Sequence, residues 1–278
     1  MRLAYAFLCS AFIGNSAPGG PAGFPADSTS PVGAGQDSVF QVGEELTYNV
    51  TYASFDIGQV RIKLLDAVRT NGRTTFKATA YIDSYRGIPF VNLHTVYENS
   101  FDEDIYSTWF SARQKKDRQW ISYVYTFDYP KQLLTMERGV WKSGVIDWHD
   151  TLHLDSPMQD GLSLFFFARR HVMSVQHISV PTVVNEKRGT TVLAFNQERT
   201  RETINALDYP VDVVHFEGEA GFVGIFGLTG GFEGWFSNDA ARVPIVATMR
   251  VLIGNVRIEL MKWNRTGWNP PRSPEDAR

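Results

Sequence analysis

Hydrophobic and polar residues alternate along the chain from about residue 46. Apolar side chains occupy every second position of Leu46–Tyr52, Val60–Leu64 and Phe76–Ile82. A two-residue period puts the apolar side chains on one face of a strand, so these runs predict half-buried β-strands. Asn71-Gly72 separates the second and third runs and is the strongest hairpin signal in the chain, because both residues tolerate positive φ.

The same alternation recurs near the C-terminus. Apolar residues take alternate positions of Val243–Ile253 and again of Val256–Leu260. Gly254-Asn255 lies between the two runs and predicts a tight two-residue hairpin. We expect these strands to form a terminal meander that closes a sheet, beside the strand Leu46–Tyr52.

Further strands are predicted through the middle of the chain. They are Tyr106–Lys115, Trp120–Asp128, Leu133–Arg138, Gln176–Val184, Thr190–Gln197 and Val211–Glu217. The segment Val91–Phe101 fits either a strand or a short helix, because its apolar residues match both periods. These patterns indicate a mainly β protein.

One segment, Ser156–His171, breaks the alternation and is the best helix candidate. Asp160 can cap such a helix, and the basic residues at its end suit a helix C-terminus. A single helix in a β protein commonly plugs one end of a curved sheet or barrel. We therefore expect Phe165–Phe167 to be core residues.

Both ends of the chain differ from the middle in composition. Met1–Ala17 has a positive start, a short apolar run and small residues, which is the order of a secretory signal peptide. That apolar run is shorter than the roughly 20 residues that cross a bilayer. Residues 18–38 are expected to be a flexible linker and 269–278 a disordered tail. A single β-rich domain is expected over 39–268, in the periplasm or outside the cell.

Charge and cysteine content narrow the classes of function. The net charge of -3 gives no electrostatic reason to expect a nucleic-acid partner. The single cysteine, Cys9, lies in the apolar run of the leader. Once the leader is removed, the chain would have no disulfide, thiol nucleophile or thiolate metal site. Aromatic residues make up 13% of the chain and suit strands.

The densest polar cluster contains Asp147, His149 and His153. Two imidazoles and a carboxylate could hold a zinc ion with a water in the fourth position. On a strand, however, the two histidines lie about 13 Å apart, too far to share one ion unless a turn intervenes. A polar strand end is the alternative interpretation, and no cofactor is expected.

The stretch Gly218–Gly231 is rich in glycine and includes the aromatic residues Phe222 and Phe226. It could be a flexible lid over a pocket, or a wide connection whose side chains tuck into the core. Trp235 follows on the next predicted strand. These three aromatic residues are the candidates for contact with a ligand, because small-molecule sites are concave and mostly apolar.

Three segments resemble the exported proteins grouped as domain of unknown function 3108. They are FQVGEELTYNVTYASFDIGQ from Phe40, Met158–Arg169 with its Asp, Ser and Arg, and Trp235–Leu260 with Trp-x-Ser-x-Asp and Arg-x-Pro. The resemblance covers nearly the whole folded part. It implies a secreted or periplasmic all-β protein with one short helix and a large, strongly bent, barrel-like antiparallel sheet. It implies no established reaction and no catalytic residues.

We therefore expect a non-catalytic protein of the cell envelope that binds an apolar or amphiphilic ligand, such as a lipid, or a glycan. The ligand would lie in the concavity of the bent sheet. Two other classes stay open. A structural or assembly partner of envelope proteins would use exposed sheet edges, and a metal-dependent hydrolase would use Asp147, His149 and His153.

Overall fold

The computed structural model describes residues 30–31, 39–88, 92–221, 230–251 and 254–274. Their elements are β1 (Ser30–Pro31), β2 (Glu45–Tyr52), β3 (Phe55–Thr70), β4 (Arg73–Ser84), β5 (His94–Asp102), β6 (Ser107–Lys116), β7 (Gln119–Asp128), β8 (Leu133–Val140), β9 (Val145–His153), α1 (Ser163–His171), β10 (Gln176–Val184), β11 (Lys187–Glu202), β12 (Val211–Ala220), β13 (Gly230–Ser237), β14 (Pro244–Arg250) and β15 (Asn255–Asn264).

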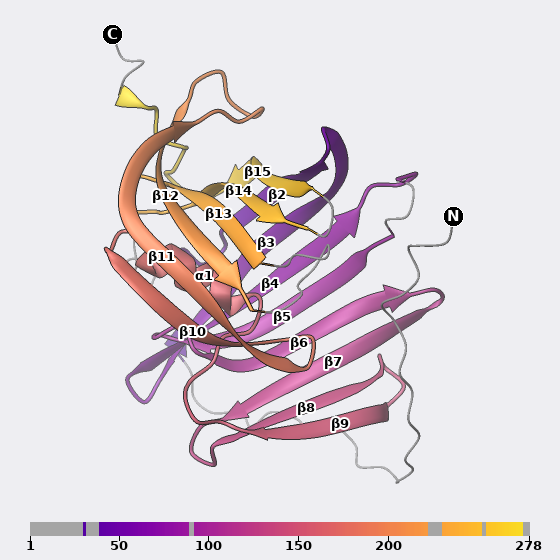
Figure 1. The fold of residues 1–278 in the computed structure, drawn as a ribbon. Coiled ribbons are helices and arrows are strands. Elements are labelled where there is room, and N and C mark those ends of the chain that lie inside the picture. The colour runs from indigo at the N-terminus through magenta and orange to yellow at the C-terminus, as the bar shows by residue number, and fades with distance from the viewer. Residues whose placement is uncertain (1–29, 32–38, 89–91, 222–229, 252–253, 275–278) are drawn as a thin grey trace.

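The strands form one antiparallel sheet that is built from two meanders. Its order is β10-β11-β12-β13-β14-β15-β2-β3-β4-β5-β6-β7-β8-β9, with β1 beside β3. The meanders join where β15 pairs with β2, which sets Leu260 opposite Tyr48 and confirms the predicted pairing of the chain's two ends. The path ends at β9 and β10, so the sheet is not closed, and it curls around α1 (Figure 1). The expected mainly β, barrel-like architecture with one helix is confirmed.

The two predicted hairpins have different outcomes. Asn71-Gly72 forms the two-residue turn between β3 and β4, with φ of 51° and 83°. The prediction at Gly254-Asn255 was wrong in its register, because Asn255 pairs with Arg250 and belongs to β15, so the turn between β14 and β15 comes before Asn255. Gly254 still supplies a positive φ of 80° in that turn. Ile253, which was expected to end the strand, lies outside the described residues.

The ambiguous segment before residue 101 is a strand, β5, and the helical alternative was wrong. Its residues alternate between buried and half-buried positions, with Thr95, Tyr97, Asn99 and Phe101 directed inward. Pairing with β4 and β6 on both sides explains why the two-residue period prevails. Val91 lies outside the described residues.

The helix is shorter than the sequence pattern predicted, since α1 begins only at Ser163. The preceding residues are extended beside β10 because Gln159 donates to the carbonyl of Pro181 and accepts from the amide of Val183, both at 2.9 Å. Phe166 and Phe167 are buried as expected, and Phe165 packs half-buried against the same core. Within the described residues, no helix has the length and apolar character needed to cross a membrane.

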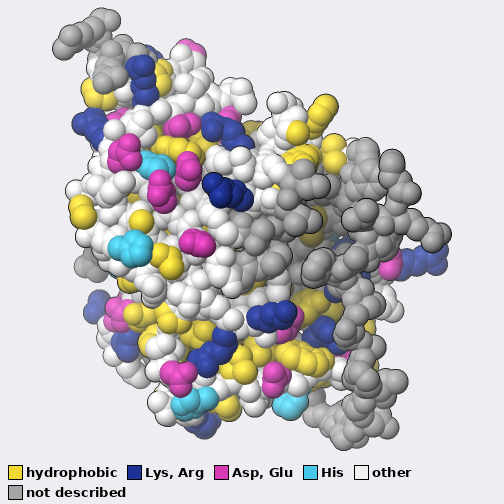
Figure 2. Space-filling model, viewed as in Figure 1, with side chains coloured by type: hydrophobic (Ala, Val, Ile, Leu, Met, Phe, Trp, Pro, Cys, Tyr) yellow, Lys and Arg dark blue, Asp and Glu magenta, His cyan; other side chains and the backbone are white. Residues whose placement is uncertain are grey.

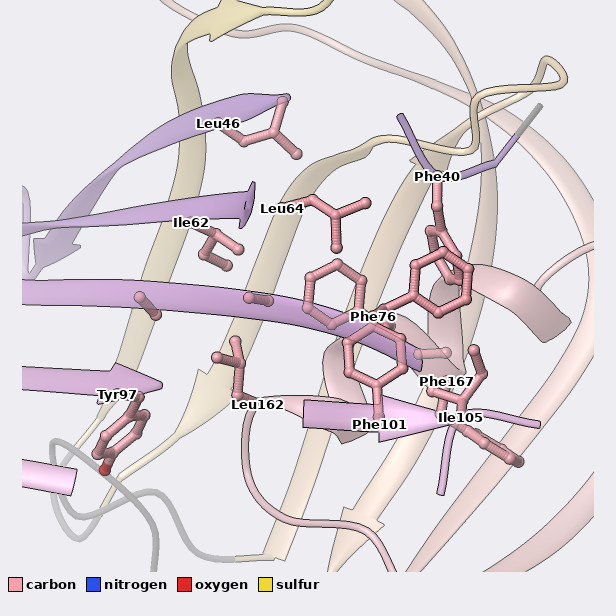
Figure 3. Close-up of a cluster of buried hydrophobic side chains, with 14 of the residues drawn as sticks. Phe40, Leu46, Ile62, Leu64, Phe76, Tyr97, Phe101, Ile105, Leu162 and Phe167 are labelled. Atoms are coloured by element: carbon pink, nitrogen blue, oxygen red, sulfur yellow. The ribbon is translucent and has the colours of Figure 1, made fainter. Parts of the chain in front are cut away.

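Aromatic rings tie the segment before β2 to the helix and to the sheet. The ring of Phe40 lies 5.6 Å from that of Phe76 and 5.5 Å from that of Phe166. Phe101 stacks on Phe166 at 4.8 Å. Edge-to-face and offset contacts of this kind add to the stability gained by burial. Figure 3 shows Phe40, Phe76 and Phe101 converging from three parts of the chain.

Part of the segment expected to be a C-terminal tail lies against β12. The amide of Asp212 donates to the carbonyl of Pro271 at 2.8 Å, and the amide of Ser273 donates to the carbonyl of Pro210 at 2.9 Å. Ser273 is buried. The ordered domain therefore extends beyond residue 268, because these backbone groups find partners on the strand edge.

Two glycines of the sheet are each covered by an aromatic ring from the neighbouring strand. Phe216 of β12 lies opposite Gly234 of β13, and Gly218 lies opposite Phe232. A Cβ at Gly234 would lie 2.1 Å from the Phe216 ring, and one at Gly218 would lie 2.2 Å from the Phe232 ring. Cross-strand aromatic cover of this kind compensates for the weak strand preference of glycine and fixes the register.

Substitution of Gly234 by Ala is expected to destabilise the fold by about 1–3 kcal/mol, because the added methyl displaces the Phe216 ring from its packed position. Denaturant unfolding measures the change. Gly231→Ala on the same strand is the control, since the nearest atom to its Cβ is 4.0 Å away. Its effect should stay within about 0.5 kcal/mol. If the two substitutions change the free energy of unfolding equally, packing of the Phe216 ring over Gly234 does not stabilise the fold.

Candidate functional site

An apolar cavity of about 280 Å³ lies between α1 and the concave face of the sheet. The sheet contributes, among others, Ile62, Ala80, Phe216, Gly234, Ala247 and Met249. The helix side contributes Leu162, Leu164, Phe165 and Ala168. Figure 3 shows three of the lining residues, Ile62, Tyr97 and Leu162. The cavity is therefore walled by both meanders and by the helix.

Small side chains at inward positions create this space. Ala80, Gly234 and Ala247 lie on three different strands of the concave wall, and the ring of Phe216 covers the backbone at Gly234. Gly234 and Ala247 are direct cross-strand partners, and Ala247 also faces Ile258. The wall is therefore recessed where β13, β14 and β15 run side by side.

Two polar side chains at the wall of the cavity have partners outside it. The hydroxyl of Tyr48 donates to the carbonyl of Pro244 at 3.2 Å. Glu233 is the only charged residue among the described lining residues. Its carboxylate lies 3.8 Å from Nε2 of His215, on the face opposite to Phe232 and Gly234. The space within is therefore suited to hydrocarbon.

A buried carboxylate holds the start of α1, as the sequence predicted for Asp160. It accepts the backbone amides of Leu162 at 2.6 Å and Ser163 at 2.9 Å. The hydroxyl of Ser107 and the side-chain amide of Asn99 donate to it at 2.7 and 3.2 Å. Burial raises the pKa of the Asp160 carboxyl, although these donors act in the opposite direction. The cluster fixes the helix start to β5 and β6.

A buried ion pair holds the other end of α1. Arg169, which is fully buried, donates to both carboxylate oxygens of Glu44, one of them at 2.9 Å. It also donates to the carbonyl of Ala241 at 3.1 and 3.0 Å, and Arg265 is a second donor to Glu44. Burial raises the pKa of Glu44, but the two guanidinium groups outweigh it and hold that pKa below its ordinary value of 4.5.

Replacing Arg169 with Met is expected to cost about 3–5 kcal/mol of unfolding free energy at neutral pH, because Glu44 keeps a buried charge with one partner removed. The depressed pKa of Glu44 means that the pair stabilises the fold above pH 4.5. Its contribution is lost as the pH falls through the folded-state pKa. The difference between wild type and variant in urea unfolding should therefore narrow on acidification.

The control is Arg199→Met, which breaks a pair with Asp212 at 2.8 Å in which Arg199 is 55% exposed. Exposed pairs contribute about 1 kcal/mol or less. If Arg169→Met lowers the free energy of unfolding by no more than Arg199→Met does, the buried pair does not hold the helix in place.

The structure does not bring the predicted metal ligands together. Asp147, His149 and His153 lie on the edge strand β9. The carboxylate of Asp147 accepts from Nε of Arg138 at 2.8 Å, and His153 lies 3.4 Å from the carboxylate of Asp155. The part of the chain that is described contains no group of three His, Cys, Asp or Glu side chains placed to hold a metal ion. The extended strand keeps these residues apart.

The aromatic ligand candidates lie apart from the cavity or outside the described part of the chain. Phe222 and Phe226 lie outside the described residues. Trp235 alternates with Gly234 and Phe236, which line the cavity, so its ring is on the other face, 5.1 Å from the ring of His215. Ala80 and Ala247 were not among the residues predicted to contact a ligand. Small residues at inward positions of strands were the available signal.

Comparison of the chain with known proteins identifies a family. Residues 47–261 match the family described as "Protein of unknown function (DUF3108)". The chain belongs to the DUF3108 family. The resemblance seen in the sequence motifs is therefore confirmed.

One solved structure is similar to this DUF3108 protein in arrangement. It is the "Crystal Structure of Beta-barrel-like Protein of Domain of Unknown Function DUF1849 from Brucella abortus". The two share 11% sequence identity, with a TM-score of 0.49, over 82% of this chain and 99% of the other. The sequence has no significant match among curated proteins.

The motifs that carry the DUF3108 resemblance converge on Arg169. The Gly-Glu motif supplies Glu44, and the helix motif supplies the capping residue Asp160 and Arg169 itself. Asp239 of the Trp-x-Ser-x-Asp motif accepts the amide of Ala241 at 2.9 Å, which positions the carbonyl that receives Arg169. These motif residues hold the scaffold around the cavity.

Proposed function

We propose that this DUF3108 protein is exported and, without catalysing a reaction, holds an apolar or amphiphilic molecule in the cavity beneath α1. The observation that carries the proposal is the cavity itself, which is apolar and recessed at Ala80, Gly234 and Ala247. Small-molecule sites are typically concave, mostly apolar and largely preformed.

The energetics of an empty cavity support an occupant. The space of about 280 Å³ beneath α1 is lined by apolar side chains, so an empty pocket leaves apolar surface without packing partners. Filling it with hydrocarbon would recover contact energy and remove apolar surface from water.

The lining favours hydrocarbon over a glycan. A sugar needs many hydrogen-bonding partners, whereas the inward side chains are aliphatic or aromatic apart from two tyrosine hydroxyls. One of these, on Tyr48, already donates to a backbone carbonyl. Hydrocarbon binding needs no activated nucleophile or acid–base pair, which agrees with a role in binding.

Substitution of Ala247 by Phe is expected to weaken binding of dodecanoate and dodecanol on the order of tenfold or more, because the ring occupies the recess. Native mass spectrometry and calorimetry with the purified domain measure this. Thr248→Phe is the matched control, since its side chain projects from the opposite face of β14 and should leave the affinity unchanged. Failure of wild type to bind either probe would overturn the proposal.

Export is tested by fractionation of cells that express the full chain with a C-terminal tag. We expect a product shortened at its N-terminus, in the periplasm or the medium, because Met1–Ala17 has the order of a signal peptide. A chain that lacks residues 1–17 should stay in the cytoplasm. Recovery of full-length protein with an intact N-terminus in the cytoplasm would contradict export.

A further inference from the structure

A row of cross-strand partners runs from the cavity along the concave face to the outer strands. Ile62, Ala80 and Tyr97, which face one another in successive pairs, all line the cavity. The row then continues through Ala112 and Tyr123 to Arg138 of β8. Neighbouring strands are about 4.8 Å apart, so Arg138 stands about 14 Å beyond Tyr97 along this row.

The character of the row changes from apolar to cationic along its length. Nζ of Lys116 donates to the hydroxyl of Tyr123 at 3.0 Å. Tyr123 lies directly opposite Arg138, whose side chain is 39% exposed and whose Nε donates to Asp147 at 2.8 Å. Among the described residues, the terminal nitrogens of Arg138 have no acceptor, so they can receive an anion. Figure 2 shows a band of hydrophobic side chains in the lower half of the view, with Lys, Arg, Asp and Glu side chains beside it.

The hairpin between β10 and β11 borders this row. Val184 lines the cavity, and two residues later Glu186 accepts from the hydroxyl of Tyr125 at 3.2 Å. Burial raises the pKa of Glu186, although Tyr125, Arg138, Lys116 and Lys187 act in the opposite direction. Lys116, Arg138 and Lys187 therefore all lie close to Glu186, and Arg138 also pairs with Asp147.

We propose that the ligand is an anionic amphiphile whose chain fills the cavity and whose headgroup binds Lys116 and Arg138. The inference rests on the proposed function, since it assigns the polar end of the same ligand. Arg138 stands about 14 Å beyond the lining residue Tyr97, a distance that a hydrocarbon chain spans, and the buried side chains of Ala112 and Tyr123 between them would move aside for that chain. Charge-assisted hydrogen bonds from lysine and arginine suit a carboxylate or a phosphate ester equally.

The test uses four probes that share one chain and differ in headgroup. They are dodecanoate, dodecyl phosphate, dodecanol and dodecyltrimethylammonium, titrated into the purified domain by calorimetry. Wild type should bind both anions at least about tenfold more tightly than dodecanol, because each charge-assisted contact contributes about a factor of ten. The order of the two anions separates a fatty acid from a phosphate ester, and either order supports the inference.

The Lys116→Gln/Arg138→Gln double variant should bind dodecanoate about as weakly as dodecanol, with the affinity for dodecanol unchanged. Lys115→Gln/Arg118→Gln is the matched control, because it removes one lysine and one arginine that flank Lys116 in sequence and are exposed. This control should keep the preference for anions. Thermal melting of each variant checks that the fold is retained.

Two results separate failure of this inference from failure of the proposed function. If dodecanol and dodecanoate bind wild type equally, or if the double variant keeps the preference for anions, the proposed headgroup site is wrong. Binding of hydrocarbon in the cavity is still supported in that case. If no probe binds wild type, the proposed function fails and this inference fails with it.

Discussion

The buried ion pair of Glu44 and Arg169 is the constraint on which the rest of the structure depends. It joins α1 to the residue that precedes β2, and Arg265 adds the end of β15 to the same carboxylate. A buried charge that loses its partner is strongly unfavourable, so the helix cannot shift without a large cost. The Asp160 cluster fixes the opposite end of the helix, and α1 is therefore held at both ends against a sheet that does not close.

A helix held in this way explains why a cavity persists. The wall opposite α1 carries Ala80, Gly234 and Ala247, and a loosely held helix would settle onto these small residues. Polar anchoring at both ends keeps the helix away from the wall, and the space between them stays apolar. The row from Tyr97 to Arg138 then runs from this apolar space to the cations on the outer strands.

The alternation of apolar and polar residues predicted the strands, but it did not predict the contacts on which the proposed function depends. Alternation in Leu46–Tyr52 and Val256–Leu260, together with the family motifs at both ends of the domain, predicted that the two ends pair. The partners Glu44 and Arg169 are 125 residues apart, and no local signal connects them. α1 was predicted too long because Gln159 pairs with β10, a tertiary contact that overrides helical periodicity. Trp235 was chosen for its aromatic ring, whereas the site is defined by small residues on the other face.

The most direct test is a crystal structure of the domain with 12-bromododecanoate, using the anomalous signal of bromine to locate the end of the chain. The expected result is a bromine peak inside the cavity, near Ile62, Ala80 and Phe216, with the carboxylate directed toward Arg138. A bromine peak on the outer face near Trp235, or an empty cavity at saturating ligand, would contradict it.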